Sequence, residues 1–230
     1  LGIPYTGAGY LGSGMAMDKS VSKRIMASCG VPTPPWRDIT YTREEIPALA
    51  EELEVPCAVK IVNGGSSIGM ALPDTREELA AALERILRYG NHVVVEKKLR
   101  GREVTVGVLG DRYLPAVEII PTSGPYFDYV AKYQSGASLE LCPAPITEEQ
   151  QRTAGEYALR LHRALGLSVY SRADFILDEA GQFWCLEINT LPGLTPASLL
   201  PKEAAAAGMS YGDLCEEILR LSLTARKERK

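Results

Sequence analysis

Two spacings of apolar residues alternate along this chain, and together they predict a mixture of helices and strands. Segments with apolar residues at helical spacing are interleaved with short runs rich in β-branched residues. Helices are expected at 17–29, 44–53, 75–89, 148–165, 201–208 and 210–223. Strands are expected at 57–62, in two runs within 92–106, at 104–109, 113–120, 172–177 and 183–188. The two β-rich runs within 92–106 are separated by a short basic linker, which suits the junction between two α+β lobes.

The last two strands are separated by a short polar segment that contains a glycine, and this pattern predicts a β-hairpin. A symmetric turn gives paired positions that sum to about 361. Asp174 then lies opposite Glu187, and Arg172 lies opposite Asn189. Because side chains two residues apart on a strand share a face, all four polar groups are expected to converge on one patch.

Two carboxylates placed across a ladder repel each other, so a positive group is expected between Asp174 and Glu187. These carboxylates and the amide oxygen of Asn189, with no His or Cys nearby, suit Mg²⁺ that keeps phosphate oxygens as its other ligands. Gly193 lets the backbone approach a ligand closely, and the apolar run after it predicts a helix whose first N–H groups hold an anion. The alternative is that both carboxylates are solvated on an exposed strand face.

Lys60 lies inside an apolar strand and marks a second candidate site. An unpaired ammonium is costly to bury, so Lys60 is expected to reach a phosphate, a carboxylate or the end of its strand. The loop 63–69 follows directly and is rich in Gly and Ser, whose successive backbone N–H groups can form an anion-binding nest. This position favours a cover for phosphate groups, and a purely structural turn is the alternative.

The string LEINTLPGLT at 186–195, with Arg-Ala-Asp at 172–174 before it and Ser-Leu-Leu-Pro at 198–201 after it, strongly resembles the D-alanine:D-alanine ligases of the ATP-grasp superfamily. The likeness includes several motifs in the family's order and covers nearly the whole chain. It implies an ATP-grasp fold, in which two α+β lobes enclose MgATP. It also implies ATP-dependent ligation of two D-alanines through an acyl phosphate, for synthesis of a peptidoglycan precursor.

The resemblance implies roles for residues around the nucleotide. Glu96 accepts a hydrogen bond from the adenine amino group, and Glu103 binds the ribose hydroxyls. Backbone groups near Lys97 and Leu99 meet the edge of the ring. The remaining residues assigned to ATP are Lys19, Lys60, Ser66, Ser67, Lys132 and Leu186, of which Lys132 contacts the γ-phosphate. The alternatives are a surface lysine for Lys19 and an edge strand with solvated charges for 92–103.

Around the reacting groups, the resemblance implies that Asp174, Glu187 and Asn189 hold two Mg²⁺ ions, for which Mn²⁺ is an alternative. It also implies that Arg172 and the Gly193 N–H stabilise the oxyanion of the tetrahedral intermediate.

The second D-alanine is expected to bind through its carboxylate to Ser198 and the Leu199 N–H, again by resemblance. Ser66 and Tyr133 would link across the closed site. The segment 121–138 lacks periodicity and is rich in Ser, Gly, Pro and Tyr, as is typical of a lid. Its Tyr-Ala-Lys-Tyr pattern favours an amine as the second nucleophile, with an ordinary surface loop as the alternative.

Two positions depart from the family pattern. Ile61 stands where the family usually has Pro, which predicts a modest change in the stiffness of the loop 63–69. Lys98 stands where a large apolar side chain is common, which predicts looser packing around adenine.

Composition excludes several other classes of protein. The net charge of −4 gives no reason to expect nucleic acid or an anionic membrane as a partner. There is no apolar run long enough to span a bilayer and no signal peptide. The five cysteines lack paired spacing, and the two histidines lie in unremarkable segments, so a disulfide framework or a His-based site is not expected. A cytoplasmic location fits best.

The chain begins with a phrase that closes a preceding domain in the family, so it resembles a fragment. Residues 1–12 are expected to be a remnant of that domain, 13–97 the central ATP-grasp lobe and 98–230 the C-terminal lobe with the metal and substrate residues. Two alternatives remain: a nucleotide-binding fragment without ligase activity, and a carboxylate–amine ligase with another second substrate. A homodimer of the full-length protein is also left open.

Overall fold

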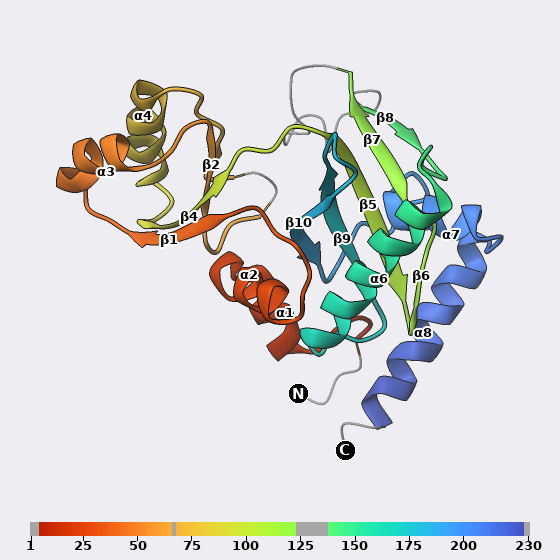
Figure 1. Ribbon diagram of the computed structural model, residues 1–230. Coiled ribbons are helices and arrows are strands. Elements are labelled where there is room, and N and C mark those ends of the chain that lie inside the picture. Colours follow the sequence, from red (N-terminus) through yellow and green to blue (C-terminus); the bar gives the residue numbers. More distant parts are fainter. Residues whose placement is uncertain (1–4, 66–67, 123–137, 228–230) are drawn as a thin grey trace.

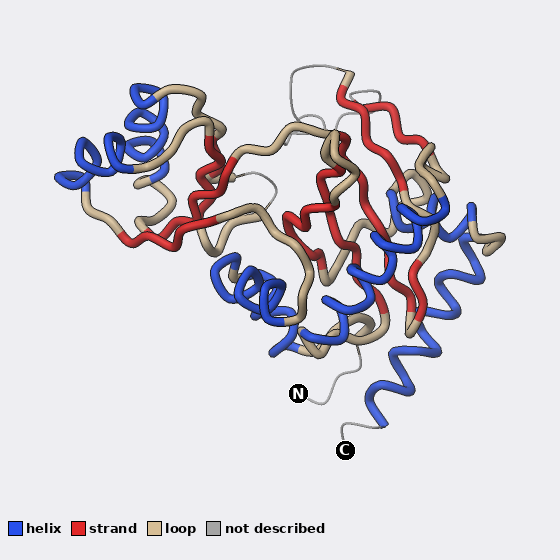
Figure 2. Tube along the Cα trace, in the orientation of Figure 1, coloured by secondary structure: helices blue, strands red, loops and turns tan. Residues whose placement is uncertain are grey.

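A computed structural model of the chain describes residues 5–65, 68–122 and 138–227. Within these ranges the chain forms two antiparallel sheets, and each sheet packs against helices. The two units lie side by side as a smaller and a larger lobe (Figures 1 and 2). The α+β class expected from the sequence is confirmed. No helix in the described part of the chain is both long and apolar enough to cross a membrane.

The smaller lobe has a four-stranded sheet in the order β1-β4-β2-β3. Its strands are β1 (Trp36–Thr40), β2 (Cys57–Ile61), β3 (Met70–Ala71) and β4 (His92–Lys97). Helix α3 (Ile46–Glu52), which follows the 3-10 turn η1 (Arg43–Glu45), and helix α4 (Arg76–Ile86) pack against this sheet. Their apolar side chains, such as Leu79 and Leu83, share one core with Val59 and Val93 of the strands.

The larger lobe has a sheet in the order β10-β9-β5-β7-β8, with β6 paired to β5. The strands are β5 (Arg102–Leu109), β6 (Arg112–Tyr113), β7 (Val117–Pro121), β8 (Ser138–Leu141), β9 (Tyr170–Leu177) and β10 (Phe183–Asn189). The helices are α1 (Tyr10–Met17), α2 (Lys19–Ser28), α6 (Glu148–Ala164), α7 (Leu199–Ala206) and α8 (Tyr211–Lys227).

The alternation of side chains along β5 separates the two faces of the larger sheet. Val104, Val106 and Val108 join the core beneath α6, whereas Leu109 packs with residues of α7 and α8. Thr105 shares the face of Leu109, since the two are an even number of residues apart. The polar hairpin residues therefore face away from the α6 core.

Helices α1 and α2 belong to the larger lobe by packing, although most of their residues lie in the range 13–97 expected for the central lobe. Ala16 of α1 and Met26 of α2 are buried in the same core as Cys185 and Ile188 of β10. In Figure 1, α2 lies between β10 and the strands β1 and β4. The apolar side of α2 thus covers one sheet while its polar residues reach toward the other.

Most predicted elements are present with ends shifted by a few residues. Asp18 caps α2 as expected, because its Oδ1 accepts a hydrogen bond from the Val21 N–H at 2.9 Å. Helix α1 and strands β1, β3 and β8 were not predicted.

His162 on α6 gives the stability of the larger lobe a dependence on pH. Burial lowers the pKa of His162 to about 4, with Arg163 acting in the same direction, and Nδ1 lies 2.7 Å from Ser171 Oγ. The unfolded chain binds a proton near pH 6.5, whereas the folded chain does so only near pH 4. The free energy of unfolding is therefore expected to fall as the pH drops from 6.5 to 4, by up to roughly 3 kcal/mol. Urea unfolding across this range should show a smaller fall for His162→Asn, and equal falls would contradict the assignment.

Gly107 on β5 gives a second test of packing. A Cβ at this position would lie 2.3 Å from Glu203 Oε2 and 2.5 Å from Leu200 Cδ1, so α7 would have to move. Gly107→Ala is expected to lower the free energy of unfolding by about 1–3 kcal/mol, measured by denaturant unfolding. Gly14→Ala on α1 is the matched control, because no atom lies within 4 Å of its added Cβ. A loss for Gly14→Ala as large as that for Gly107→Ala would contradict the steric explanation.

Candidate active site

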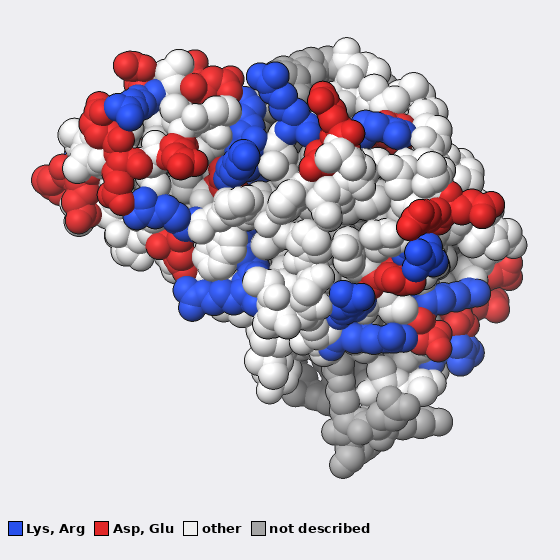
Figure 3. Space-filling model, in the orientation of Figure 1, with Lys and Arg blue, Asp and Glu red and all other residues white. Residues whose placement is uncertain are grey.

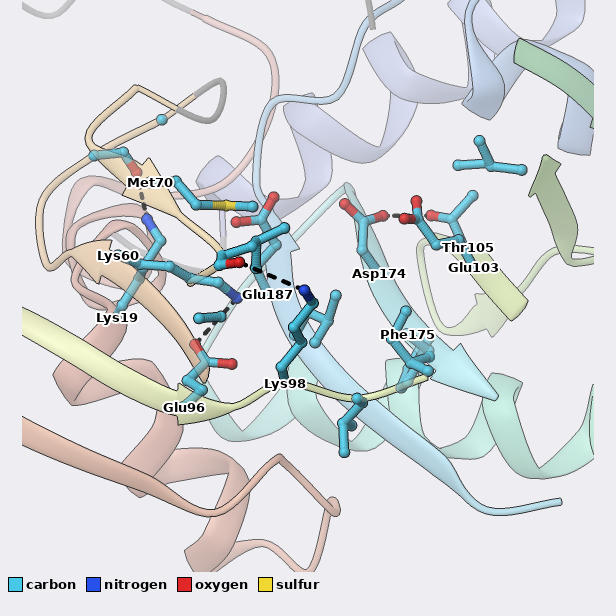
Figure 4. A pocket seen from close by; sticks show the side chains of 18 of the residues that line it. Lys19, Lys60, Met70, Glu96, Lys98, Glu103, Thr105, Asp174, Phe175 and Glu187 are labelled. Carbon is cyan, nitrogen blue, oxygen red and sulfur yellow. Dashed lines mark hydrogen bonds and ion pairs between the residues drawn. The ribbon is translucent and has the colours of Figure 1, made fainter. Parts of the chain in front are cut away.

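A cavity lies where the two lobes meet, and residues of both lobes line it (Figure 4). Its polar lining includes Lys19, Lys60, Glu96, Lys98, Glu103, Thr105, Arg172, Asp174 and Glu187. On the face shown in Figure 3, Lys and Arg side chains gather near the junction of the lobes, whereas Asp and Glu are densest over α3 and α4. The junction therefore offers a cationic surface beside a cavity that contains both signs of charge.

The hairpin of β9 and β10 brings the predicted polar residues together. Asp174 is paired with Glu187 and Arg172 with Asn189, as the sequence predicts. In Figure 4 the carboxylates of Asp174 and Glu187 extend on the same side of the two strands. The convergence expected for the hairpin is confirmed.

A β-bulge between Cys185 and Glu187 makes this pairing possible. Nearer the turn the register differs by one residue from the expected one, since Phe183 lies opposite Leu177. The extra residue, Leu186, reverses the alternation of side chains along β10. Phe183 and Cys185 point into the core before the bulge, and Ile188 does so after it. Without the bulge, Glu187 would follow the inward alternation and leave the cavity.

Asp174 accepts hydrogen bonds from three strands. Its Oδ1 accepts from Arg172 Nε at 2.9 Å and from Thr105 Oγ1 at 2.6 Å. Its Oδ2 accepts from Arg172 Nη2 at 3.0 Å and from Asn189 Nδ2 at 3.0 Å. Thr105 lies directly opposite Asp174 on β5. The carboxylate is thus fixed in position from both neighbouring strands.

The positive group beside Asp174 in this structure is the guanidinium of Arg172. Burial alone lowers the pKa of Arg172, but the negative charge of Asp174, and to a smaller extent of Glu203 and Glu187, raises it above the ordinary value. Arg172 therefore stays charged. Burial raises the pKa of Glu203 itself well above its usual range, although Arg172 and the Gly107 N–H oppose this.

The donor set of Asp174, Glu187 and Asn189 fits a hard cation. All three offer oxygen and lie on two neighbouring strands, and Asp174 and Glu187 line the cavity. Among the described residues, no group of three or more His, Cys, Asp or Glu side chains has the arrangement of a metal site. A cation bound here would therefore need further ligands from phosphate oxygens or water, as Mg²⁺ usually does.

Lys60 reaches a carboxylate, which is one of the three partners expected for it. Its Nζ lies 3.1 Å from Glu96 Oε1, and Lys23 Nζ lies 3.3 Å from Glu96 Oε2. The side chains of Lys23 and Glu96 are only 1% and 2% exposed. Burial alone raises the pKa of Glu96, but Lys60 and Lys23 hold it below its ordinary value. Glu96 therefore lies ionised between two ammonium groups.

The loop after Lys60 is fixed at both ends. Lys19 Nζ donates to the Gly64 carbonyl, and the Ile61 N–H donates to the Gly69 carbonyl at 2.9 Å. A Cβ at Gly64 would lie 2.3 Å from Ile61 Cγ2, so the loop folds closely over that side chain. The family's Pro could not supply the Ile61 N–H. Ile61 thus anchors the loop by a hydrogen bond instead of by a ring.

The strand that leaves the smaller lobe contributes the other expected nucleotide residues. Lys97, Leu99 and Glu103 line the cavity, as does Leu186 of the bulge. Lys98 Nζ donates to Asp74 Oδ1 at 2.6 Å and to the Leu72 carbonyl at 3.4 Å. The side chain of Lys98 is therefore anchored in the wall of the cavity.

Gly193 and Ser198 lie together beyond the hairpin. A Cβ added at Gly193 would lie only 2.8 Å from Ser198 Oγ, so the backbone of Gly193 approaches Ser198 closely. Ser198 Oγ and Thr195 Oγ1 form a hydrogen bond of 2.8 Å. Ser198 is the N-cap of α7 and Leu199 is its first residue. None of these residues lines the cavity described above. Ser66, Ser67, Lys132 and Tyr133, and most of the expected lid, lie outside the described residues.

Comparison with known proteins identifies the family. The family model described as the C-terminal part of D-Ala–D-Ala ligase matches residues 25–220. The D-alanine–D-alanine ligase of Oleidesulfovibrio alaskensis is 43% identical over 224 residues, which are 97% of this chain and 72% of that protein. This chain belongs to the D-Ala–D-Ala ligase family.

Solved structures of D-Ala–D-Ala ligases have the same fold. The Bacillus anthracis ligase superposes with a TM-score of 0.85 at 36% identity, over all of this chain and 74% of that one. Its complex with ATP gives 0.83 at 33% identity, with 73% of that chain covered. The VanG D-Ala:D-Ser ligase of Enterococcus faecalis gives 0.84 at 31% identity, over 96% of this chain and 66% of that one. The ATP-grasp architecture inferred from the resemblance is confirmed.

Sequence reasoning missed two residues of this D-Ala–D-Ala ligase: Thr105, which lines the cavity, and Lys23, which pairs with the lining residue Glu96. Thr105 reads as an ordinary β-branched strand residue, although its place two positions after Glu103 on a strand puts it on the same face. Lys23 reads as a surface lysine on an amphipathic helix. Its position four residues after Lys19, one helical turn along α2, was the available signal.

Proposed function

We propose that this protein ligates two D-alanines to D-alanyl-D-alanine with consumption of ATP. The observation that carries the proposal is the array in which Arg172, Asp174 and Glu187 line the cavity and Asn189 donates to Asp174, in a chain of the D-Ala–D-Ala ligase family. ATP is the nucleotide in one structure with this fold. The product is a precursor for peptidoglycan, made in the cytoplasm.

The reaction proceeds in two steps that balance without a redox partner. An oxygen of the first D-alanine carboxylate attacks the γ-phosphorus of ATP, which forms an acyl phosphate and releases ADP. The amino group of the second D-alanine then attacks the acyl carbon, and phosphate leaves as the nitrogen loses its proton. The protein contributes mainly by positioning these groups and stabilising charge.

On the nucleotide side, Lys19 and Lys60 provide positive charge for the phosphates, together with the loop that carries Ser66 and Ser67 and with Lys132. Glu96 and the backbone near Lys97 and Leu99 bind adenine beside Leu186, and Glu103 binds the ribose. Because Lys60 is paired with Glu96, contact with a phosphate requires Lys60 to share its ammonium protons between the two anions. The short ion pair supports a Lys60 that is held in place before the nucleotide arrives.

Asp174, Glu187 and Asn189 would hold two Mg²⁺ ions, or Mn²⁺. When bound, these ions would neutralise charge on the phosphates. A cation bound at Asp174 would share the carboxylate that accepts from Arg172 in this structure. Arg172 would then have N–H groups available to stabilise the oxyanion of the tetrahedral intermediate. The Gly193 N–H would assist, and Ser198 with the Leu199 N–H would bind the second carboxylate. Tyr133 and Ser66 would close the site.

Phosphate release by the full-length protein tests this proposal. Release that requires ATP, Mg²⁺ and D-alanine, with D-alanyl-D-alanine as product, is the expected result. ATP binding by calorimetry without D-alanine-dependent release would favour a nucleotide-binding protein that lacks ligase activity. If the mixed dipeptide with D-serine forms faster than D-alanyl-D-alanine, another second substrate is favoured. The similarity to a D-Ala:D-Ser ligase is the reason to test D-serine. Sedimentation of the same sample would test a homodimer.

A further inference from the structure

A chain of polar contacts crosses from the smaller lobe to the bulge in β10. Lys23 Nζ, which lies 3.3 Å from Glu96 Oε2, also donates to Thr33 Oγ1 at 2.7 Å. Thr33 Oγ1 in turn donates to the Cys185 carbonyl at 2.9 Å. Cys185 is the last residue before the bulge that turns Glu187 toward the cavity. The contacts thus join the nucleotide side of the site to the strand that carries Glu187.

The segment before β1 strengthens this connection. The Cys185 N–H donates to the Pro32 carbonyl at 2.7 Å, so Cys185 is held by both of its backbone groups. Neither bond belongs to the β9–β10 ladder. Because β10 is the edge strand of its sheet, backbone groups of Cys185 that point away from β9 have no ladder partner, so these outside hydrogen bonds help to fix the strand next to the bulge.

Lys23 is buried beyond what a surface helix requires. Its side chain is 1% exposed, and burial lowers its pKa while Glu96 opposes the change. A buried ammonium is costly unless each contact is well made. An apolar residue at position 23, near the buried Met26, would satisfy the packing of the helix without a buried charge.

We propose that Lys23 is a positioning residue that couples the two sides of the active site, by fixing Glu96 at one end and the Glu187 bulge, through Thr33 and Cys185, at the other. The inference rests on the proposed function for the roles of Glu96 and Glu187. Lys23 itself does not line the cavity. It acts through its partners, so its two connections can be broken separately.

Two variants separate the connections. Thr33→Val removes the hydroxyl between Lys23 and Cys185 but leaves the Lys23–Glu96 pair. It is expected to lower kcat about tenfold, to leave the Kd for ATP within about twofold, and to speed amide exchange at 185–188. Lys23→Met removes both connections, so it is expected to raise the Kd for ATP about tenfold as well as to lower kcat.

The matched control is Tyr41→Phe. Tyr41 OH donates to the Leu83 carbonyl at 2.8 Å, so this change removes the same kind of hydroxyl–carbonyl bond from the core of the smaller lobe. It is expected to leave kcat, the Kd for ATP and exchange at 185–188 unchanged. Thr33→Ser keeps the hydroxyl and is expected to restore kcat and slow exchange.

Amide exchange is measured on the full-length protein without nucleotide, so it does not depend on ligation. Unchanged exchange at 185–188 in Thr33→Val, or equal effects of Tyr41→Phe, would overturn the role of Lys23. The role would also be overturned if Lys23→Met kept the wild-type Kd for ATP. If the wild-type protein forms no dipeptide, the proposed function fails while exchange still decides the coupling. If Lys23→Met does not fold, Thr33→Val and Thr33→Ser decide it.

Discussion

Glu187→Gln is expected to reduce Mg²⁺-dependent formation of D-alanyl-D-alanine by at least about a thousandfold. Gln keeps the size of the side chain but removes one of two facing carboxylates, and a loss of several kcal/mol in stabilisation of the transition state corresponds to this factor. The bulge holds residue 187 on the cavity side, so the change should leave the hairpin intact. Initial rates of phosphate release over a range of Mg²⁺ concentrations measure the effect.

The matched control for this change is Glu118→Gln. Glu118 is also a carboxylate of the larger sheet, but it is buried, pairs with Arg102 through bonds of 2.6 and 2.7 Å and does not line the cavity. Glu118→Gln is expected to lower stability and to retain activity. A second readout is the rise in Tm on adding Mg²⁺ and ATP, which Glu187→Gln should reduce. Near-wild-type rates and an unchanged rise in Tm for Glu187→Gln would remove the metal assignment.

The sequence could predict the hairpin because its determinants are local. Two apolar runs and a Gly-containing turn define the pairing, and Asp174 and Glu187 are indeed opposite each other. The bulge was not predicted, since turn symmetry gives one register for the whole hairpin. The sequence of β10 does contain a signal for the bulge. The inward apolar residues Phe183 and Cys185 are followed by Ile188 and not by residue 187, so the alternation along the strand is interrupted.

Elements whose stability comes from distant packing were not predictable in this way. Helix α1 contains two glycines, which lower its intrinsic helix propensity, and a Cβ at Gly12 would lie 2.8 Å from the Leu165 carbonyl of another helix end. Strand β1 has a largely half-exposed, polar pattern, so only its pairing with β4 defines it. The burial of Lys23 depends on Glu96, more than 70 residues away along the chain, and on Thr33.

The second large expected effect follows from changing Glu96, which pairs with Lys23 and Lys60. Glu96→Gln is expected to lower the free energy of unfolding at pH 7 by about 3–5 kcal/mol, because it leaves the ammonium groups of Lys23 and Lys60 close together without their shared carboxylate. The Kd for ATP should also rise, since Glu96 is the proposed partner of the adenine amino group. Urea unfolding and calorimetry measure the two effects separately.

The dependence of this loss on pH identifies its cause. Without Glu96, the pKa of buried Lys23 should fall further, whereas the lysines of the unfolded chain keep their value near 10.4. The unfolded state then binds more protons than the folded state, so the stability of Glu96→Gln should rise with pH relative to the wild type between pH 7 and about 10. Lys23→Met combined with Glu96→Gln should lose less stability than the two single changes added together. A deficit that is constant with pH and additive between the two variants would mean that lost packing, and not an uncompensated buried charge, destabilises the protein.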